Sequence, residues 1–193
     1  MPSKPRKTIS SAKELRALAH PLRIRLLQLI GQQGPLTATQ CAKVVGESVA
    51  NCSYHINTLA KYGYVEQSDG GQGREKPWQR VYEGYSFSDV GVDEETALAG
   101  EAMSNAFIEV AFDRTREGLR TLSLEPEDWR EAVGMSDSSE WLTAAETAAI
   151  RDEIQEIMRR YLHRRDDPSA RPDGARPVYF FLSAMVAPGI KPE

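Results

Sequence analysis

Cysteine is scarce in this sequence of 193 residues, which contains only Cys41 and Cys52. Two cysteines are too few for a disulfide-stapled scaffold, and they lack the C-x-x-C spacing of a redox motif. A hydrophobic content of 40% is that of an ordinary globular protein, which can bury a core without covalent cross-links. We therefore expect a protein of a reducing compartment.

Long apolar runs are also missing. No window approaches the roughly 18 uninterrupted apolar residues that indicate a membrane-spanning helix. The first residues, MPSKPRKTISSAKE, contain no apolar segment of signal-peptide length. We expect neither secretion nor membrane insertion, and we predict a cytoplasmic location.

Positive charge is concentrated in the first part of the chain, although the formal net charge is −4. Residues 1–83 contain twelve Lys or Arg and six Asp or Glu, whereas residues 84–193 contain twelve and twenty-two. The first part is a candidate for a polyanionic partner, and the second part is not. A basic surface can bind a polyanion or can simply face solvent, so the predicted local structure is needed to choose between these two interpretations.

Two short helices with a tight turn are predicted in the basic part. The segment Thr37-Ala-Thr-Gln40 is a capping box that opens a helix ending near Gly46. Only Glu47 separates this glycine from the next N-cap residue, Ser48. Helices joined by so short a turn cross steeply, which is typical of a helix-turn-helix. Upstream, Ser11 and Pro21 are the expected starts of two further helices.

The second helix of this pair has two different faces. The residues Cys52, His55, Ile56 and Leu59 recur at the spacing of a buried stripe. The opposite face is polar and nearly free of acids, and consists of Ala50, Asn51, Ser53, Tyr54, Asn57, Thr58 and Lys61. An acid-poor polar face is suited to nucleic acid, and a solvated surface helix is the plainer alternative.

A β-hairpin is predicted after this helix. Gly63 is typical of a helix C-terminus. The segment Tyr64-Val-Glu-Gln67 is predicted to form a strand, with Trp78-Gln-Arg-Val-Tyr82 as its partner. The Gly-rich tip between them carries Arg74 and Lys76. A helix-turn-helix followed by a hairpin with a basic tip is a winged helix.

The blocks HPLRIRLLQLI, LTATQCAKVVG, SVANCSYHINTLAKYGYVE and GREKPW together resemble the arsenic-repressor-type (ArsR-type) branch of bacterial winged-helix transcriptional regulators. The resemblance covers about residues 10–90. It implies that the helix from Ser48 to Tyr62 enters the major groove of DNA, that the hairpin reaches the minor groove or backbone, and that the unit is a homodimer.

Candidate DNA contacts follow from side-chain chemistry. Asn51 can pair with adenine, Ser53 can donate or accept a hydrogen bond, and Tyr54 can reach a phosphate or a thymine methyl group. Cations at the hairpin tip suit a phosphate or the minor groove. The full set of candidates is Ser48, Ala50, Asn51, Ser53, Tyr54, Asn57, Lys61, Arg74, Lys76 and Arg80.

No metal site, cofactor site or catalytic site is predicted. Relatives in the ArsR-type branch hold metals with a Cys-x-Cys pair or with carboxylates and histidines along a C-terminal helix, and this sequence has neither pattern. Cys52 lies on the expected buried stripe, where a free cysteine behaves as a small hydrophobe. No feature supplies an activated thiolate in a cleft.

A long helix is predicted over about Asp93 to Leu122, which contains no proline. Its roughly 45 Å exceed what the first domain needs for its own core, so we expect it to form a dimer interface. A capping box at Thr143 predicts another helix, and the segment VYFFLSAMV (178–186) reads as a buried terminal strand. Four aromatic residues in this half are candidates for a small-molecule effector pocket or for core: Trp129, Trp141, Phe180 and Phe181.

The predicted fold is mainly α, with a winged helix-turn-helix over residues 1–90 and a helical dimerisation and effector region over residues 91–193. The predicted function is a DNA-binding transcriptional regulator, most simply a repressor, that binds an inverted-repeat operator as a homodimer and is not an enzyme. The alternative is a winged-helix module that binds protein without reading DNA sequence. The acid-poor helix face favours DNA, and the net negative charge favours the alternative.

Overall fold

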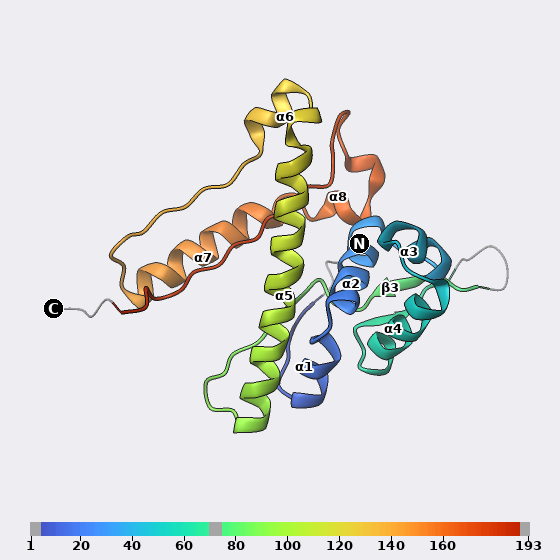
Figure 1. The fold of residues 1–193 in the computed structure, drawn as a ribbon, viewed down its shortest axis with the longest axis horizontal. Coiled ribbons are helices and arrows are strands. Elements are labelled where there is room, and N and C mark those ends of the chain that lie inside the picture. The colour runs from blue at the N-terminus through green and yellow to red at the C-terminus, as the bar shows by residue number, and fades with distance from the viewer. Residues whose placement is uncertain (1–4, 70–74, 190–193) are drawn as a thin grey trace. The chain divides into compact units, whose positions relative to one another are not determined.

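The computed structural model describes residues 5–69 and 75–189 (Figure 1). The chain divides into two compact units, Met1–Pro126 and Glu127–Glu193. The first unit contains all the elements of the predicted winged helix.

The first unit begins with a short strand and two helices. Strand β1 (Arg6–Thr8) precedes helix α1 (Ala12–Leu18), which Ser11 caps as predicted by accepting a hydrogen bond from the Glu14 N–H. Helix α2 (Pro21–Gln33) begins at Pro21. Proline is well suited to the first helical position, because a backbone N–H there would have no partner within the helix. The helix continues through Gly31 and ends at Gln33.

The helix-turn-helix and its wing follow. Helix α3 (Ala38–Val45) and helix α4 (Val49–Lys61) are joined by the predicted turn. Strands β2 (Val65–Gln67) and β3 (Trp78–Arg80) pair antiparallel, and Trp78 also forms a bridge with Leu36. The predicted fold class, mainly helical with a β2–β3 hairpin wing, is confirmed.

Strand β4 (Gly84–Ser86) forms a pairing that was not predicted from the sequence. It lies parallel to β1, and the Ile9 N–H donates a hydrogen bond of 2.8 Å to the Ser86 carbonyl. This pairing ties the N-terminal segment to the chain that leaves the wing. Ile9, which is 2% exposed, is thereby held in the core of the unit.

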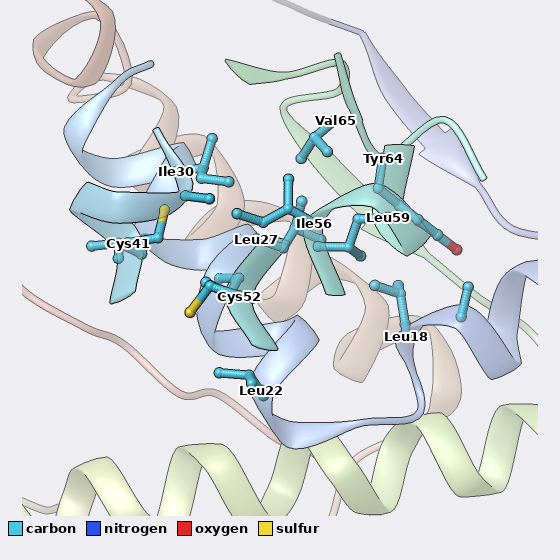
Figure 2. Close-up of a cluster of buried hydrophobic side chains, with 14 of the residues drawn as sticks. Leu18, Leu22, Leu27, Ile30, Cys41, Cys52, Ile56, Leu59, Tyr64 and Val65 are labelled. Atoms are coloured by element: carbon cyan, nitrogen blue, oxygen red, sulfur yellow. The ribbon is translucent and has the colours of Figure 1, made fainter. Parts of the chain in front are cut away.

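The core of the first unit lies between α1, α2, α3, α4 and β2 (Figure 2). It is built from side chains that the helical periodicity places inward, together with Tyr64, which lies between α4 and β2. The Tyr64 hydroxyl donates a hydrogen bond of 2.9 Å to the Glu14 carbonyl, which satisfies its polar atom. The largest fully buried members include Leu15, Leu18, Leu26, Ile30, Ile56, Leu59, Tyr64 and Val65.

Helix α5 (Glu94–Thr121) is the predicted long helix, and Asp93 caps it through the Thr96 N–H. One face packs on α1 and α2 and buries Ala99, Ala106 and Val110. Gly100 belongs to this face, because a Cβ there would lie 2.0 Å from the ring of Phe87. Part of α5 therefore completes the core of the first unit, contrary to the expectation that the helix is too long for such a role.

A second face of α5 is exposed. The side chains of Leu98, Ile108, Phe112 and Leu119 are 59%, 40%, 49% and 47% exposed. The helix thus has one apolar face that its own unit covers and another that its own unit leaves uncovered. A short 3-10 helix, η1 (Leu122–Leu124), ends the element.

The second unit contains helices α6 (Glu127–Ala132), α7 (Ala144–Arg159) and α8 (His163–Asp166) and a 3-10 turn, η2 (Pro168–Ala170). The capping box predicted at Thr143 is present, with Glu146 as its second member. None of the described residues after Val110 is buried. The second unit therefore has no core of its own within the described part of the chain.

The predicted buried strand over residues 178–186 is wrong. The structure assigns no strand to this segment, and Val178, Phe180 and Val186 are 41%, 67% and 92% exposed. Its β-branched and aromatic composition favours a strand, but a strand also needs a neighbouring strand and a covering layer. The compact units divide after Pro126, and the boundary predicted between functional regions at residue 90 stays a prediction.

Candidate nucleic-acid interface

The turn between α3 and α4 fixes how the two helices cross. Thr37 and Gln40 form the reciprocal capping box that opens α3, and Gly46 ends it with φ of 73°. Glycine enters this left-handed region without steric cost. The Ser48 hydroxyl then accepts a hydrogen bond of 3.1 Å from the Asn51 N–H and starts α4.

The buried face of α4 is the one predicted. Cys52, Ile56 and Leu59 have no exposed area, and His55 is 7% exposed. Figure 2 shows Ile56 and Leu59 among the core residues of α2 and β2. Because these side chains fix the rotation of α4 about its axis, they also determine which residues face outward.

Several residues predicted to contact DNA are exposed on the outward face of α4. Tyr54 is 67% exposed, and Ala50, Asn57 and Lys61 are also exposed. Helix α4 itself contains no acidic residue. A helix with an aromatic hydroxyl, amides and a lysine on an acid-free face is suited to a DNA groove.

Other side chains of this face already have partners inside the domain. The Asn51 Nδ2 donates a hydrogen bond of 3.0 Å to the Glu47 Oε2, and the Asn57 Nδ2 donates one of 2.8 Å to the Ser53 carbonyl. Ser48 acts as the N-cap. The amide of Asn51 is therefore oriented by Glu47, a contact that was not predicted from the sequence.

A residue next to the wing tip contacts α3. Glu75, beside the tip, accepts a hydrogen bond of 3.1 Å from the Thr39 N–H. Lys76 follows it and is exposed. Arg74 lies outside the described residues, so its predicted contact stays a prediction.

Arg80 has a place in the packing of the domain. Its side chain lies so close to Gly31 that a Cβ there would meet the Arg80 Cδ at 2.4 Å, and its guanidinium lies 5.3 Å from the Tyr85 ring centroid. The missing side chain of Gly31 makes room for the aliphatic stem of Arg80. Arg80 therefore contributes to packing between β3 and α2, and its predicted DNA contact is an additional role that stays a prediction.

A cluster behind the outward face was missed in the sequence. His20 is the N-cap of α2, and its ring centroid lies 4.4 Å from that of His55. The ring of Tyr54 meets His55 edge-on at 5.1 Å. The pair His20-Pro21 indicates a helix start, because a polar residue before a proline is typical of an N-cap. The contact of the His20 ring with His55 depends on the tertiary fold and has no local signal in the sequence.

Both histidine rings favour the neutral form. Burial lowers the pKa of His20, and Arg23 lowers it further. Burial also lowers the pKa of His55, with further contributions from His20 and Arg23 and an opposing one from Glu47. Two adjacent imidazoles beside a guanidinium resist taking up a proton, because each added charge lies in a partly desolvated, positive environment.

The cysteines are placed as small core residues. Cys41 and Cys52 are free and have no exposed area. Burial raises the pKa of Cys41 to about 12 and raises the pKa of Cys52 as well. Within residues 5–69 and 75–189, no three His, Cys, Asp or Glu side chains are grouped so that they could hold a metal ion.

The aromatic residues of the second unit are not enclosed. Trp141 is 79% exposed and Phe181 is 49% exposed, while the guanidinium of Arg176 lies 5.2 Å from the Trp129 ring centroid. An effector pocket built from these residues stays a prediction. In the described part of the chain, no helix is long and apolar enough to cross a membrane.

Residues 18–67 match the family model of a helix-turn-helix domain. The matched segment spans α2, α3, α4 and β2, which are the elements that hold the outward face of α4. No curated protein matches the chain. The chain thus contains a helix-turn-helix domain, a motif that DNA-binding proteins use to place their second helix in the major groove.

Proposed function

We propose that this protein is a transcriptional regulator of the ArsR-like type that binds an inverted-repeat operator as a homodimer and represses by occupying the promoter. The observation that carries the proposal is the acid-free outward face of α4, held by a capped turn and a buried stripe within a helix-turn-helix domain. In this proposal Asn51, Ser53 and Tyr54 contact base edges. Lys61, Arg74 and Lys76 contact phosphates or the minor groove.

The exposed face of α5 supports the homodimer. Leu98, Phe112 and Leu119 are separated by multiples of seven residues, which is the repeat of a helix seam. A helix that already uses one face for its own core and still exposes such a seam is suited to a second copy of itself. The covered face packs on the domain through Ala99, Ala106 and Val110. The exposed ion pairs Arg16–Glu95 (2.7 Å) and Arg25–Asp113 (3.0 Å) also join α5 to α1 and α2.

The charges along α5 favour an antiparallel pair. Residues 94–113 contain only acidic charges, whereas residues 114–121 carry Arg114, Arg116 and Arg120 against a single glutamate, Glu117. Side by side and antiparallel, the acidic end of one helix faces the basic end of the other. A parallel pair would align like charges along its whole length, which is unfavourable.

Sequence-specific binding is tested by selection. The purified full-length chain, incubated with random-sequence duplexes at low salt, is expected to enrich an inverted repeat whose half-sites are about one helical turn apart. Enrichment of a single half-site would contradict the homodimer. No enrichment would favour the alternative, a winged-helix module that binds protein.

The orientation of the dimer is tested with introduced thiols. Ile108 lies midway between Leu98 and Leu119, so Ile108→Cys is expected to cross-link to its own copy with a short bismaleimide. Leu98→Cys and Leu119→Cys are expected to cross-link only when the two proteins are mixed. The unmodified chain is the control, because its two thiols are buried. Efficient cross-linking of Leu98→Cys or Leu119→Cys to itself would indicate a parallel pair, and no cross-linking at any position would remove α5 from the interface.

A further inference from the structure

We propose that His20 and His55 form a neutral positioning pair that holds the DNA-reading side chains of α4, so that discrimination between operator and random DNA weakens when the pair takes up a proton. This inference rests on the proposed function, because it assumes that the outward face of α4 reads sequence. It adds two residues that do not themselves touch DNA. They are positioning residues for Tyr54 and Asn51.

The pair connects the start of α2 to the reading face of α4. His20 accepts a hydrogen bond of 3.2 Å from the Leu22 N–H at its Nδ1, so a neutral His20 carries its proton on Nε2. Its ring packs against His55, and His55 packs against Tyr54. Tyr54 is thus supported from behind by a ring that is 7% exposed, although its own side chain extends into solvent.

The surroundings of the two histidines disfavour a positive charge on either ring. Arg23 faces both rings from the first turn of α2, and the positive end of the α2 dipole lies at His20. Arg23 is itself close to Tyr54 and Tyr62. In the described part of the chain, the buried Nδ1 of His55 has no hydrogen-bond partner.

Glu47, in the turn before α4, opposes the lowering of the pKa of His55 by burial, and it is the acidic group that does so among the described residues. Glu47 also accepts the hydrogen bond from Asn51 that orients its amide. A protonated His55 therefore competes with Asn51 for the same carboxylate. Protonation of His20 removes the acceptor that caps Leu22 and places a second cation beside Arg23.

These changes affect sequence reading rather than general affinity. A proton on either ring disturbs the packing behind Tyr54, and a proton on His55 also attracts the Glu47 carboxylate that orients Asn51. The added positive charge strengthens attraction to any DNA, because phosphates are the same in every sequence. The ratio of operator affinity to random-DNA affinity cancels this general attraction and isolates the positioning effect.

The folded domain loses stability in the same pH range. Since the pKa of each ring is lower in the folded chain than the ordinary value near 6.5, the unfolded chain binds protons more readily as the pH falls through that value. The stability contributed by the neutral pair is present above about pH 6.5 and is lost below it. Binding has to be measured where circular dichroism shows the domain still folded.

The test compares the full-length chain with the double variant His20→Asn/His55→Phe. The asparagine keeps an N-cap acceptor and the phenylalanine keeps a ring, but neither side chain titrates. For the unmodified chain, the ratio of affinities for a duplex with the selected repeat and a scrambled duplex is expected to fall severalfold from about pH 7.5 to about pH 5.5, and to fall further at any lower pH where the domain is still folded. The variant is expected to keep a constant ratio.

Three outcomes overturn the inference in distinguishable ways. A high ratio that does not change with pH in the unmodified chain would exclude proton-sensitive positioning while leaving the proposed function intact. An equal fall in the double variant would assign the effect to other groups. A ratio of one at about pH 7.5, where both rings are neutral, would contradict sequence reading itself and therefore the proposed function as well.

Discussion

Replacing Ile56 in α4 by alanine is expected to lower the free energy of unfolding by about 2–5 kcal/mol. Ile56 has no exposed area and lies in the core beside Leu59 and Val65 (Figure 2). Truncation removes its transfer free energy and leaves a cavity, which close-packed neighbours from α2 and β2 fill only partly.

The matched control for this change is Val49→Ala in the same helix. Val49 is 46% exposed, so its truncation should change stability by less than about 0.5 kcal/mol. Urea unfolding of both variants measures the difference. Ile56→Ala should still bind operator with the normal salt dependence under conditions where it is folded, because the residue faces inward. A loss of stability as small as that of Val49→Ala would show that the inward face of α4 has been misassigned.

Local signals made the helix-turn-helix predictable. Each of the caps at Ser11, Thr37, Ser48 and Thr143 forms a hydrogen bond with a residue three positions later. Because both partners lie in one short segment, the cap can be predicted from the sequence. The buried stripe of α4 follows from helical spacing for the same reason. These features also determine which residues face outward, and this is why a candidate interface could be predicted from the sequence.

Long-range contacts were not predictable in this way. The parallel pairing of β1 with β4 joins segments far apart in the chain, and neither is long enough to be recognised as a strand. The contact of His20 with His55 likewise depends on how α2 crosses α4. Composition suggested a strand at residues 178–186, but composition does not supply the neighbouring strand that it needs.

The side-chain partners of the outward face of α4 form an intermediate case. The sequence placed Asn51 on the outward face correctly, but the hydrogen bond to Glu47 was overlooked although it spans only four residues. Arg80 was included among the candidate DNA contacts because of its charge, and its stem also packs against Gly31; its DNA contact stays a prediction. Charge and position in the sequence therefore predict which residues lie on the surface of α4 and the wing. The contacts that each of these side chains makes inside the domain depend on the packing of the fold.

Asn51→Ala is the second change with a large expected effect. If its amide pairs with an adenine, its loss should cost about 1–3 kcal/mol on the selected operator and change random-DNA binding little. Lys61→Ala, Arg74→Ala and Lys76→Ala should instead weaken binding to both DNAs and reduce the slope of log affinity against log salt by about 0.9 each, if each neutralises one phosphate. Lys43→Ala, an exposed lysine on α3 outside the proposed contact set, is the matched control and should change neither quantity.

The most direct test of the central claim, that the outward face of α4 reads DNA sequence, is titration of these variants with operator and random duplexes across a salt series. The account predicts that Asn51→Ala loses operator preference with an unchanged salt slope, whereas the lysine and arginine variants lose slope and keep most of the preference. If Asn51→Ala and Lys76→Ala weaken binding to both duplexes equally and leave the slope unchanged, this face does not read sequence.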